Sequence, residues 1–164
     1  GVMSSWSSGA ATTSYQIPEI DVVSGTAEMS TYGGDKVVIE GTNFGPLRMP
    51  LWSEETQSES LVNAPDIVAL YGRDERAQFT ARCIVLQEHK KIECRAAPGV
   101  GANLDFSAVV GNQPSKFAAS TVGYLPPRLE QVSGEGSKNA ATEGGQRIVI
   151  NGGQFGPVSL NAVE

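Results

Sequence analysis

Apolar and polar residues alternate with a period of two along several short segments of the chain. Residues 79–85 place Phe, Ala, Cys and Val at every second position, and residues 104–110 do the same with Leu, Phe, Ala and Val. Successive side chains of a strand point to opposite sides of a sheet, so each segment predicts a strand with one buried face. No stretch shows the apolar spacing of an amphipathic helix, and we expect little or no helix.

Turn-forming residues divide the remaining chain into more short strands. Further strands are expected over residues 19–24, 36–41, 67–71, 92–94 and 117–124. The 19 Gly and 9 Pro residues suit such a chain, because they favour the backbone angles of tight turns. Seven or so short strands separated by turns predict an all-β fold, an immunoglobulin-like β-sandwich.

The strand pattern occurs twice. Residues 33–46 (GGDKVVIEGTNFGP) and 144–157 (GGQRIVINGGQFGP) are identical at eight of fourteen positions. The preceding segments, 18–25 (PEIDVVSG) and 127–134 (PRLEQVSG), also match, and Tyr15 corresponds to Tyr124. The offset is 109 residues in the earlier block (18 to 127) and 111 in the later one (33 to 144). A period of this length suits a whole sandwich of about 100 residues in tandem repeat.

The repeat also predicts the domain boundaries. Residues 17–124 are expected to form one complete module, residues 1–16 the closing strand of a preceding module, and residues 125–164 the opening strands of a following, incomplete one. Two explanations stay open. The chain is part of a longer covalent array, or separate subunits complete each other's sandwiches by strand addition.

These motifs resemble the immunoglobulin-like, plexin and transcription factor family, called IPT or TIG. The shared elements are the opening Pro18 to Gly25, the strand from Gly33 to Gly41, the Asn-Phe-Gly-Pro turn ending at Pro46, a cysteine pair, and Tyr124 before a Pro-Pro dipeptide. The resemblance implies an immunoglobulin-like module. Family members serve as extracellular repeats, as modules beside carbohydrate enzymes and as dimerising parts of transcription factors, so the resemblance implies little about function. The segment 47–66 departs from the family pattern.

The two cysteines are placed to meet across a hairpin. In a hairpin centred on Glu88 and His89, opposed residues have numbers that sum to 177, as Cys83 and Cys94 do. Directly opposed residues are close enough for a disulfide, which we predict here. The alternative is a pair of reduced cysteines in the core. A disulfide would indicate an oxidising compartment and favours an extracellular or cell-surface location.

The chain lacks the residue patterns of catalysis and cofactor binding. His89 is the only histidine and is expected in a solvated turn, Ser133 and Ser137 lie among glycines without a P-loop pattern, and Gly99 to Gly101 fails as a dinucleotide fingerprint. The acidic pairs Glu54-Glu55 and Asp74-Glu75 lack the spacing of a calcium loop. We therefore expect no enzyme, no cofactor and no metal.

The net charge of the chain limits the classes of partner that we expect it to bind. The formal net charge is −6, with Lys and Arg scattered singly, so nucleic acid is not an expected partner. No apolar run is long enough to cross a membrane. The first residues lack the basic and apolar regions of a signal peptide, so for a secreted protein we expect the signal upstream. The expected partners are neighbouring modules or copies of the chain, in a homo-oligomer or filament, and beyond these glycans or a cell-surface protein.

The segment 47–66 is expected to be an inserted polar loop with one apolar cluster. Met49, Leu51 and Trp52 either fold back over the sandwich as a lid or form an exposed interface with a neighbouring module or subunit. The first residues are rich in hydroxyls and form either an edge strand or a surface for O-glycosylation. The candidate acceptors are Ser4, Ser5, Ser7, Ser8, Thr12, Thr13 and Ser14.

Together these patterns favour a non-catalytic, extracellular structural or adhesive repeat protein, which would form a rod or filament by module stacking or strand complementation. Two alternatives stay open. The first is the ligand-binding ectodomain of a cell-surface receptor, with the insertion as its contact surface. The second is an accessory module of a carbohydrate-active enzyme.

Overall fold

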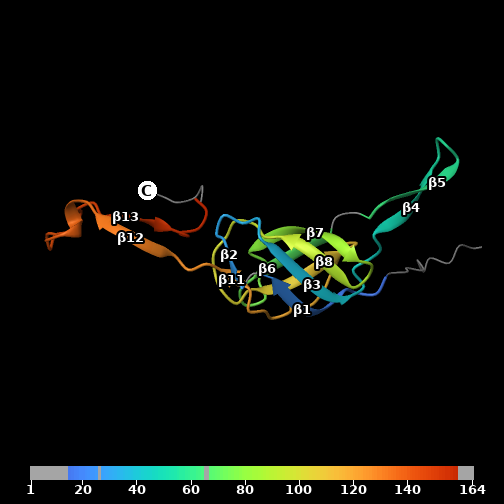
Figure 1. Cartoon of the computed structure of the whole chain (residues 1–164), viewed down its shortest axis with the longest axis horizontal. Coiled ribbons are helices and arrows are strands. Elements are labelled where there is room, and N and C mark those ends of the chain that lie inside the picture. The colour runs from blue at the N-terminus through green and yellow to red at the C-terminus, as the bar shows by residue number, and fades with distance from the viewer. Residues whose placement is uncertain (1–14, 26, 65–66, 159–164) are drawn as a thin grey trace, which may run out of the picture.

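The structure is a computed structural model that describes residues 15–25, 27–64 and 67–158, and in these ranges it is an all-β protein without an α-helix (Figure 1). A single 3-10 turn, η1, spans Glu135–Ser137. The strands are β1 (Glu19–Gly25), β2 (Glu28–Met29), β3 (Lys36–Thr42), β4 (Arg48–Ser53), β5 (Ser58–Asn63), β6 (Ile67–Gly72), β7 (Phe79–Gln87), β8 (Lys91–Arg95), β9 (Asp105–Val110), β10 (Gln113–Pro114), β11 (Gly123–Tyr124), β12 (Arg128–Ser133) and β13 (Val149–Gly153).

Seven strands form one antiparallel sheet, in the order β1-β3-β8-β7-β6-β9-β10. The sheet curls around a common core, so that β1 approaches β9 although the two strands are far apart in the strand order. A short parallel pair, β2 and β11, lies at one end. This architecture is consistent with a β-sandwich, in which one continuous sheet supplies both walls.

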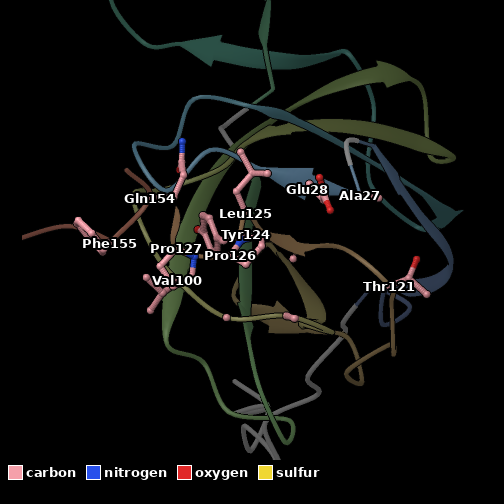
Figure 2. A pocket seen from close by; sticks show the side chains of 13 residues that line it. Ala27, Glu28, Val100, Thr121, Tyr124, Leu125, Pro126, Pro127, Gln154 and Phe155 are labelled. Carbon is pink, nitrogen blue, oxygen red and sulfur yellow. The ribbon is translucent and has the colours of Figure 1, made fainter. Parts of the chain in front are cut away.

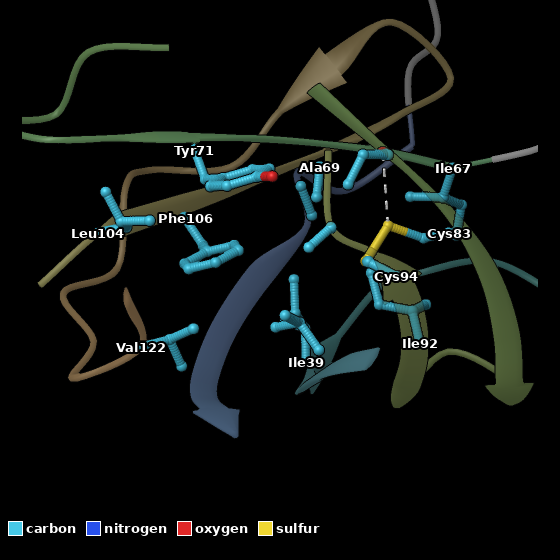
Figure 3. Packing of buried hydrophobic residues seen from close by; sticks show 14 of the residues in the cluster. Ile39, Ile67, Ala69, Tyr71, Cys83, Ile92, Cys94, Leu104, Phe106 and Val122 are labelled. Carbon is cyan, nitrogen blue, oxygen red and sulfur yellow. Dashed lines mark hydrogen bonds between the residues drawn. A yellow bond between two sulfur atoms is a disulfide. The ribbon is translucent and has the colours of Figure 1, made fainter. Parts of the chain in front are cut away.

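Period-two patterning explains which side chains fill the core (Figure 3). Along β7, Ala81 and Cys83 are buried whereas Thr80 and Arg82 are exposed. The other central strands contribute buried side chains in the same way. Phe106 from β9 stacks on the ring of Tyr71 from β6, with ring centroids 4.8 Å apart. The largest fully buried side chains are Tyr71, Phe44, Phe106, Met29, Ile39, Ile92, Leu104 and Val37.

The disulfide is confirmed. Cys83 in β7 and Cys94 in β8 are directly paired, their Cα atoms are 4.0 Å apart, and the sulfur atoms are bonded. The register that sums to 177 holds from Arg82 to Val85, after which a bulge before Gln87 shifts it by one. The bond closes a loop that spans 11 residues in sequence, inside the core and adjacent to β3.

Two expectations from the sequence need correction. The segment expected to be a loop over 47–66 contains a β-hairpin over residues 48–63, formed by β4 and β5, with Arg48 opposite Asn63 and Ser53 opposite Ser58. The closing strand over 117–124 is largely irregular. Only Gly123 and Tyr124 form a strand, preceded by a single bridge between Ala118 and Phe106. Ser120 accepts a bond from the amide of Val122 and so bends the chain between the two.

The sequence repeat is matched by a structural one. β1 pairs with β3 from Glu19 opposite Thr42 to Gly25 opposite Val37, with a bulge between Ile20 and Val22. β12 pairs with β13 in the equivalent register, and its bulge falls at the equivalent place, between Leu129 and Gln131. Even the turn glycines agree, since φ is 76° at both Gly33 and Gly144. The C-terminal hairpin therefore has the same strand pairing as the β1–β3 hairpin of the seven-stranded sheet, and we call that sheet with its core the first module.

Close backbone approach explains one glycine of the repeat. At Gly41 in β3, an added Cβ would collide with the backbone oxygen of Glu19 on β1 and lie 2.9 Å from the ring of Phe44. Gly152 has the same surroundings in the copy, between Arg128 and Phe155. Beside the bulge the backbones of the paired strands therefore lie so close that only glycine fits at this position.

Replacing Gly41 by alanine is expected to lower the free energy of unfolding by about 3 kcal/mol, because the new Cβ overlaps with the backbone of β1. Urea denaturation followed by circular dichroism measures the change. Gly153→Ala is the matched control, since an added Cβ there meets nothing within 4 Å. Equal stability of the two variants would contradict the close approach.

Removing the disulfide by the double substitution Cys83→Ala and Cys94→Ala is expected to lower the free energy of unfolding by about 2–3 kcal/mol, because the unfolded chain regains the entropy of the closed loop. Denaturant unfolding of the oxidised and substituted proteins measures this difference. Independently, the intact mass of the unfolded wild-type chain should rise by two hydrogen atoms on reduction; an unchanged mass would show that the cysteines are already reduced.

Candidate functional site

The copied hairpin exposes the face that its counterpart buries. Ile39 of β3 is 0% exposed, whereas Ile150 at the same position of β13 is 51% exposed. Phe44 is 1% exposed and Phe155 is 51% exposed. Five apolar side chains of the second hairpin are uncovered in this way. They are Leu129, Val132, Ile148, Ile150 and Phe155. We call this set the open face.

Covering the open face would release substantial free energy. Fully burying a side chain of this size is worth about 1.5–3 kcal/mol. Because all five are roughly half exposed, their complete burial corresponds to roughly 4–8 kcal/mol. Exposed apolar patches on folded proteins often coincide with interaction sites, so the open face is a candidate binding surface.

A specific contact fixes the second hairpin to the first module. Gln154 follows β13, and its side-chain oxygen accepts hydrogen bonds from both the amide of Thr31 (2.9 Å) and the hydroxyl of Thr31 (2.8 Å). Thr31 is 2% exposed, so this is a largely desolvated polar contact. The equivalent of Gln154 in the first module is Asn43, whose amide donates to the carbonyl oxygen of Ile17 at 3.0 Å. The longer Gln side chain thus contacts the first module, whereas the shorter Asn side chain bonds within its own sheet region.

Beside this contact lies an apolar groove with a volume of about 640 Å³ (Figure 2). Its walls come from one end of the first module, from the linker that leads to β12, and from the turn after β13. The lining residues are Ala27, Glu28, Val100, Gly101, Ala102, Thr121, Gly123, Tyr124, Leu125, Pro126, Pro127, Gln154 and Phe155. Glu28 is the single charged residue among them. We call this the junction groove.

The β4–β5 hairpin projects from the opposite end of the sandwich (Figure 1). Its apolar residues are exposed, with Met49 at 37%, Leu51 at 53% and Trp52 at 59%. Between the two possibilities for this cluster, a lid over the sandwich and an exposed surface, the structure therefore favours the exposed surface. Leu61, which is 68% exposed and opposite Pro50, extends the cluster onto the second strand.

Two buried tyrosines join the core to the junction. The hydroxyls of Tyr71 and Tyr124 are 2.8 Å apart, Tyr124 donates to the carbonyl oxygen of Ala97 (2.6 Å), and the amide of Ala97 donates to Tyr71 (2.8 Å). Since the proton of Tyr124 is engaged by Ala97, Tyr71 donates to Tyr124. Burial raises the pKa of both phenols. Sequence-distant segments are thus closed into one hydrogen-bonded ring.

The residues considered for catalysis or metal binding do not converge. His89 is exposed in a turn, where its amide donates to the carbonyl oxygen of Gly45. The pair at Glu54 lies in the tip of the β4–β5 hairpin, and that at Asp74 in the turn after β6. Within the part of the chain that the structure describes, no three His, Cys, Asp or Glu side chains are grouped to hold a metal ion.

The glycine-rich candidates have local structural roles. Ser137 donates to the carbonyl oxygen of Gly134 within the turn that holds η1. Gly99 is buried against the rings of Phe79 and Tyr124, where a Cβ would lie 2.6 Å from Phe79. Neither segment precedes a helix that could bind a phosphate. The proposed O-glycosylation acceptors, residues 4–14, lie outside the described residues.

The junction contact and groove were not expected from the sequence. The repeat alignment contains a signal for the contact, namely Gln154 where the first module has Asn43. That signal could not reveal its partner, because Thr31 lies more than a hundred residues earlier in the chain. Val100, in the groove, follows a Pro-Gly turn without any distinctive pattern.

No protein-family model matches the chain, and no match was found among curated proteins or solved structures. The described residues contain no helix that is long and apolar enough to cross a membrane. Inference about function therefore depends on the surfaces described above.

The buried tyrosine pair predicts a loss of stability in alkali. Below pH about 10 the phenols are neutral in both the folded and unfolded states. Above it the unfolded chain ionises them while the folded chain, with raised pKa values, retains the protons, so unfolding becomes more favourable as the pH rises. Urea denaturation from pH 8 to pH 12 measures this slope. The variant Tyr124→Phe should show a smaller slope, and an equal slope would exclude a contribution from this pair.

Proposed function

We propose that the chain is a non-catalytic, extracellular structural protein of the IPT/TIG type, whose modules assemble in tandem into a rod or filament. The observation that carries the proposal is the second hairpin, which repeats the register and bulge of β1–β3 but leaves its apolar face open. Such a hairpin is the beginning of a sandwich. It requires further strands to cover it, because two strands alone are marginally stable in water.

The first module indicates what those strands are. There the edge of β3 that faces away from β1 pairs with β8, from Lys36 opposite Arg95 to Glu40 opposite Lys91. Among the described residues, β13 pairs only with β12, so its equivalent edge is free. A strand equivalent to β8, followed by equivalents of β7, β6 and β9, would extend this sheet and bury the open face. Those strands come from the same polypeptide or from another subunit.

The junction favours a stiff arrangement of modules. Only Leu125, Pro126 and Pro127 separate β11 from β12, and two prolines limit the backbone freedom of the linker. The bond between Gln154 and Thr31 adds a second connection across the junction. In Figure 1 the second hairpin continues the long axis of the molecule beyond the sandwich. Repetition of such a junction would give an elongated rod.

The location outside the cytosol rests on the disulfide, since bonds of this kind persist in oxidising compartments. Tyr15 supports the tandem arrangement at the other end. It is 93% exposed, whereas Tyr124, its repeat counterpart, is 5% exposed and packed in the core. In an array, the position of Tyr15 would likewise belong to the core of a preceding module.

A second candidate is a receptor ectodomain that binds a ligand through the β4–β5 hairpin. The observation in its favour is the exposed cluster at Leu51, Trp52 and Leu61, since aromatic residues are enriched in binding surfaces. The tandem assembly is preferred because it also accounts for the open face and the junction contact.

A chimeric chain tests the tandem proposal. The repeat alignment places Pro46 opposite Pro157, so residues 47–124 can be joined directly after Pro157 to complete the second module. The completed chain should fold as two sandwiches, with slow hydrogen exchange at β13, weaker binding of a hydrophobic dye and a larger maximum dimension by X-ray scattering. In the same chimera, Ile150→Ser should lower the stability of the second module by about 2–4 kcal/mol.

The control is Ile150→Ser in the chain of 164 residues, where the side chain is half exposed and the effect on stability should be small. A chimera whose added segment stays unfolded, with β13 exchanging as before, would show that the second hairpin does not begin a sandwich.

A further inference from the structure

The β4–β5 hairpin and the junction groove lie at opposite ends of the sandwich (Figure 1). Completion of the second module would not explain either surface. Phe155 is the single residue that the groove shares with the open face, and the hairpin shares none. The hairpin carries an exposed apolar cluster, and the groove is lined mainly by apolar residues. The two surfaces could therefore meet only between successive modules or between copies of the chain.

The β4–β5 hairpin carries apolar side chains of the kind that pack against another protein surface. Residues on one strand alternate between its two faces, so Met49 and Leu51 lie on one face, with Val62 opposite Met49, while Pro50 and Trp52 lie on the other, with Leu61 opposite Pro50. Both faces of the hairpin thus carry apolar side chains, whereas polar side chains would suffice for a hairpin that remains in solvent. A two-stranded hairpin becomes stable when one face packs against another surface.

The repeat indicates where the hairpin would lie relative to a preceding module. The hairpin begins two residues after Pro46, and Gly45 corresponds to Gly156. Gly156 lies against Val100 of the first module, where an added Cβ would be 2.5 Å from the Val100 side chain. Val100, Gln154 and Phe155 all line the junction groove. In an array, the hairpin of each module would therefore start beside the junction groove of the module before it.

We propose that the β4–β5 hairpin docks in the junction groove of the preceding repeat, and that in this chain the groove binds the hairpin of a second copy. The proposed site is continuous with the contact between Gln154 and Thr31, and it rests on the proposed tandem function. The hairpin supplies Trp52 and Leu61 as apolar anchors. Val100, Leu125 and the two prolines of the linker supply the apolar wall that receives them.

One charged residue on each surface is of opposite sign to the other, although both surfaces are acidic overall. Arg48 is the only basic residue of β4 and β5, and it lies at the base of the hairpin. Glu28 is the only charged residue that lines the groove. The acidic residues of the hairpin, Glu54, Glu55 and Glu59, lie in or near its tip, and Glu59 is directly opposite Trp52. Opposite single charges would set the orientation of docking rather than supply most of the affinity.

The two surfaces differ, so the contact between copies is head-to-tail. Such an interface leaves a free hairpin on the first copy and a free groove on the last, and it adds further copies unless the rotation closes a ring. The same contact, formed within one polypeptide, would bridge consecutive modules and oppose bending at the junction. One geometry thus serves a covalent array and an assembly of separate subunits.

Sedimentation velocity of the oxidised chain over a wide range of concentration tests this proposal. The wild type is expected to form a concentration-dependent series of oligomers. Trp52→Ser on the hairpin and Val100→Asp in the groove are each expected to weaken association about tenfold or more, because each removes an anchor or its receiving wall. Both positions are exposed, so circular dichroism of the variants should match that of the wild type.

A mixture of the two variants gives the most direct test of the head-to-tail contact. Trp52→Ser retains an intact groove and Val100→Asp retains an intact hairpin, so together they can form one productive contact. The mixture is expected to give a heterodimer that grows no further, at concentrations where each variant alone is monomeric. A wild type that is monomeric at all concentrations, or a mixture without heterodimers, would overturn the proposal.

Two control variants separate this contact from other associations. Ile84→Ser removes a side chain of β7 that is 58% exposed, close to the 59% of Trp52, but belongs to neither surface, and it should leave association unchanged. Ile150→Ser alters the open face. Association that disappears with Ile150→Ser but persists with Trp52→Ser would overturn the proposal and assign self-association to the open face. Failure of the chimera to fold, with head-to-tail oligomers intact, would instead contradict only the tandem function.

Discussion

A β-sheet with apolar side chains on one face must cover that face, and this requirement organises the whole chain. In the first module the sheet meets it by curling, so that β3, β6, β7, β8 and β9 all turn their apolar residues toward one core. The second hairpin has the same sequence pattern and the same bulged pairing, but no sheet curls over it within the described residues. The same local structure therefore has two outcomes, a buried core in one place and an exposed apolar face in the other.

The end of the first module combines core and junction in one segment. Tyr124 completes the hydrogen-bonded ring with Tyr71 and Ala97, and the linker to the second hairpin starts at the next residue. The linker cannot move far without disturbing the core, since the amide of Leu125 is also bonded to the carbonyl oxygen of Met29 at 2.7 Å. This coupling is a physical reason why consecutive modules would hold a defined orientation.

Much of the fold could be predicted from the sequence because its signals are local. The alternation around Cys83 gave the buried face of β7, and the spacing of the hairpin gave its register and the disulfide partner. The repeat predicted the second hairpin down to the positions of its turn glycines. These inferences need only the period of a strand and the geometry of a pair.

The site was less predictable because it depends on contacts between distant segments. The β4–β5 hairpin lacks the glycine-containing turn that marks many hairpins, since its tip is Glu-Glu-Thr-Gln with Gln57 at a φ of 51°. The irregular path of residues 117–122 follows from side-chain bonds such as that of Ser120 to the carbonyl oxygen of Leu104. No pattern in the sequence predicts the contact between Gln154 and Thr31.

The parallel pairing of β2 with β11 has a mechanical consequence. β11 is the last strand before the linker, and it is held to the segment after β1 by bonds from Gly123 to Ala27 and from Leu125 to Met29. If the ends of the module are pulled apart, parallel neighbours are drawn in opposite directions along their length. Their hydrogen bonds are then loaded together in shear instead of being peeled one after another. A module built in this way resists extension at the point where tension enters it.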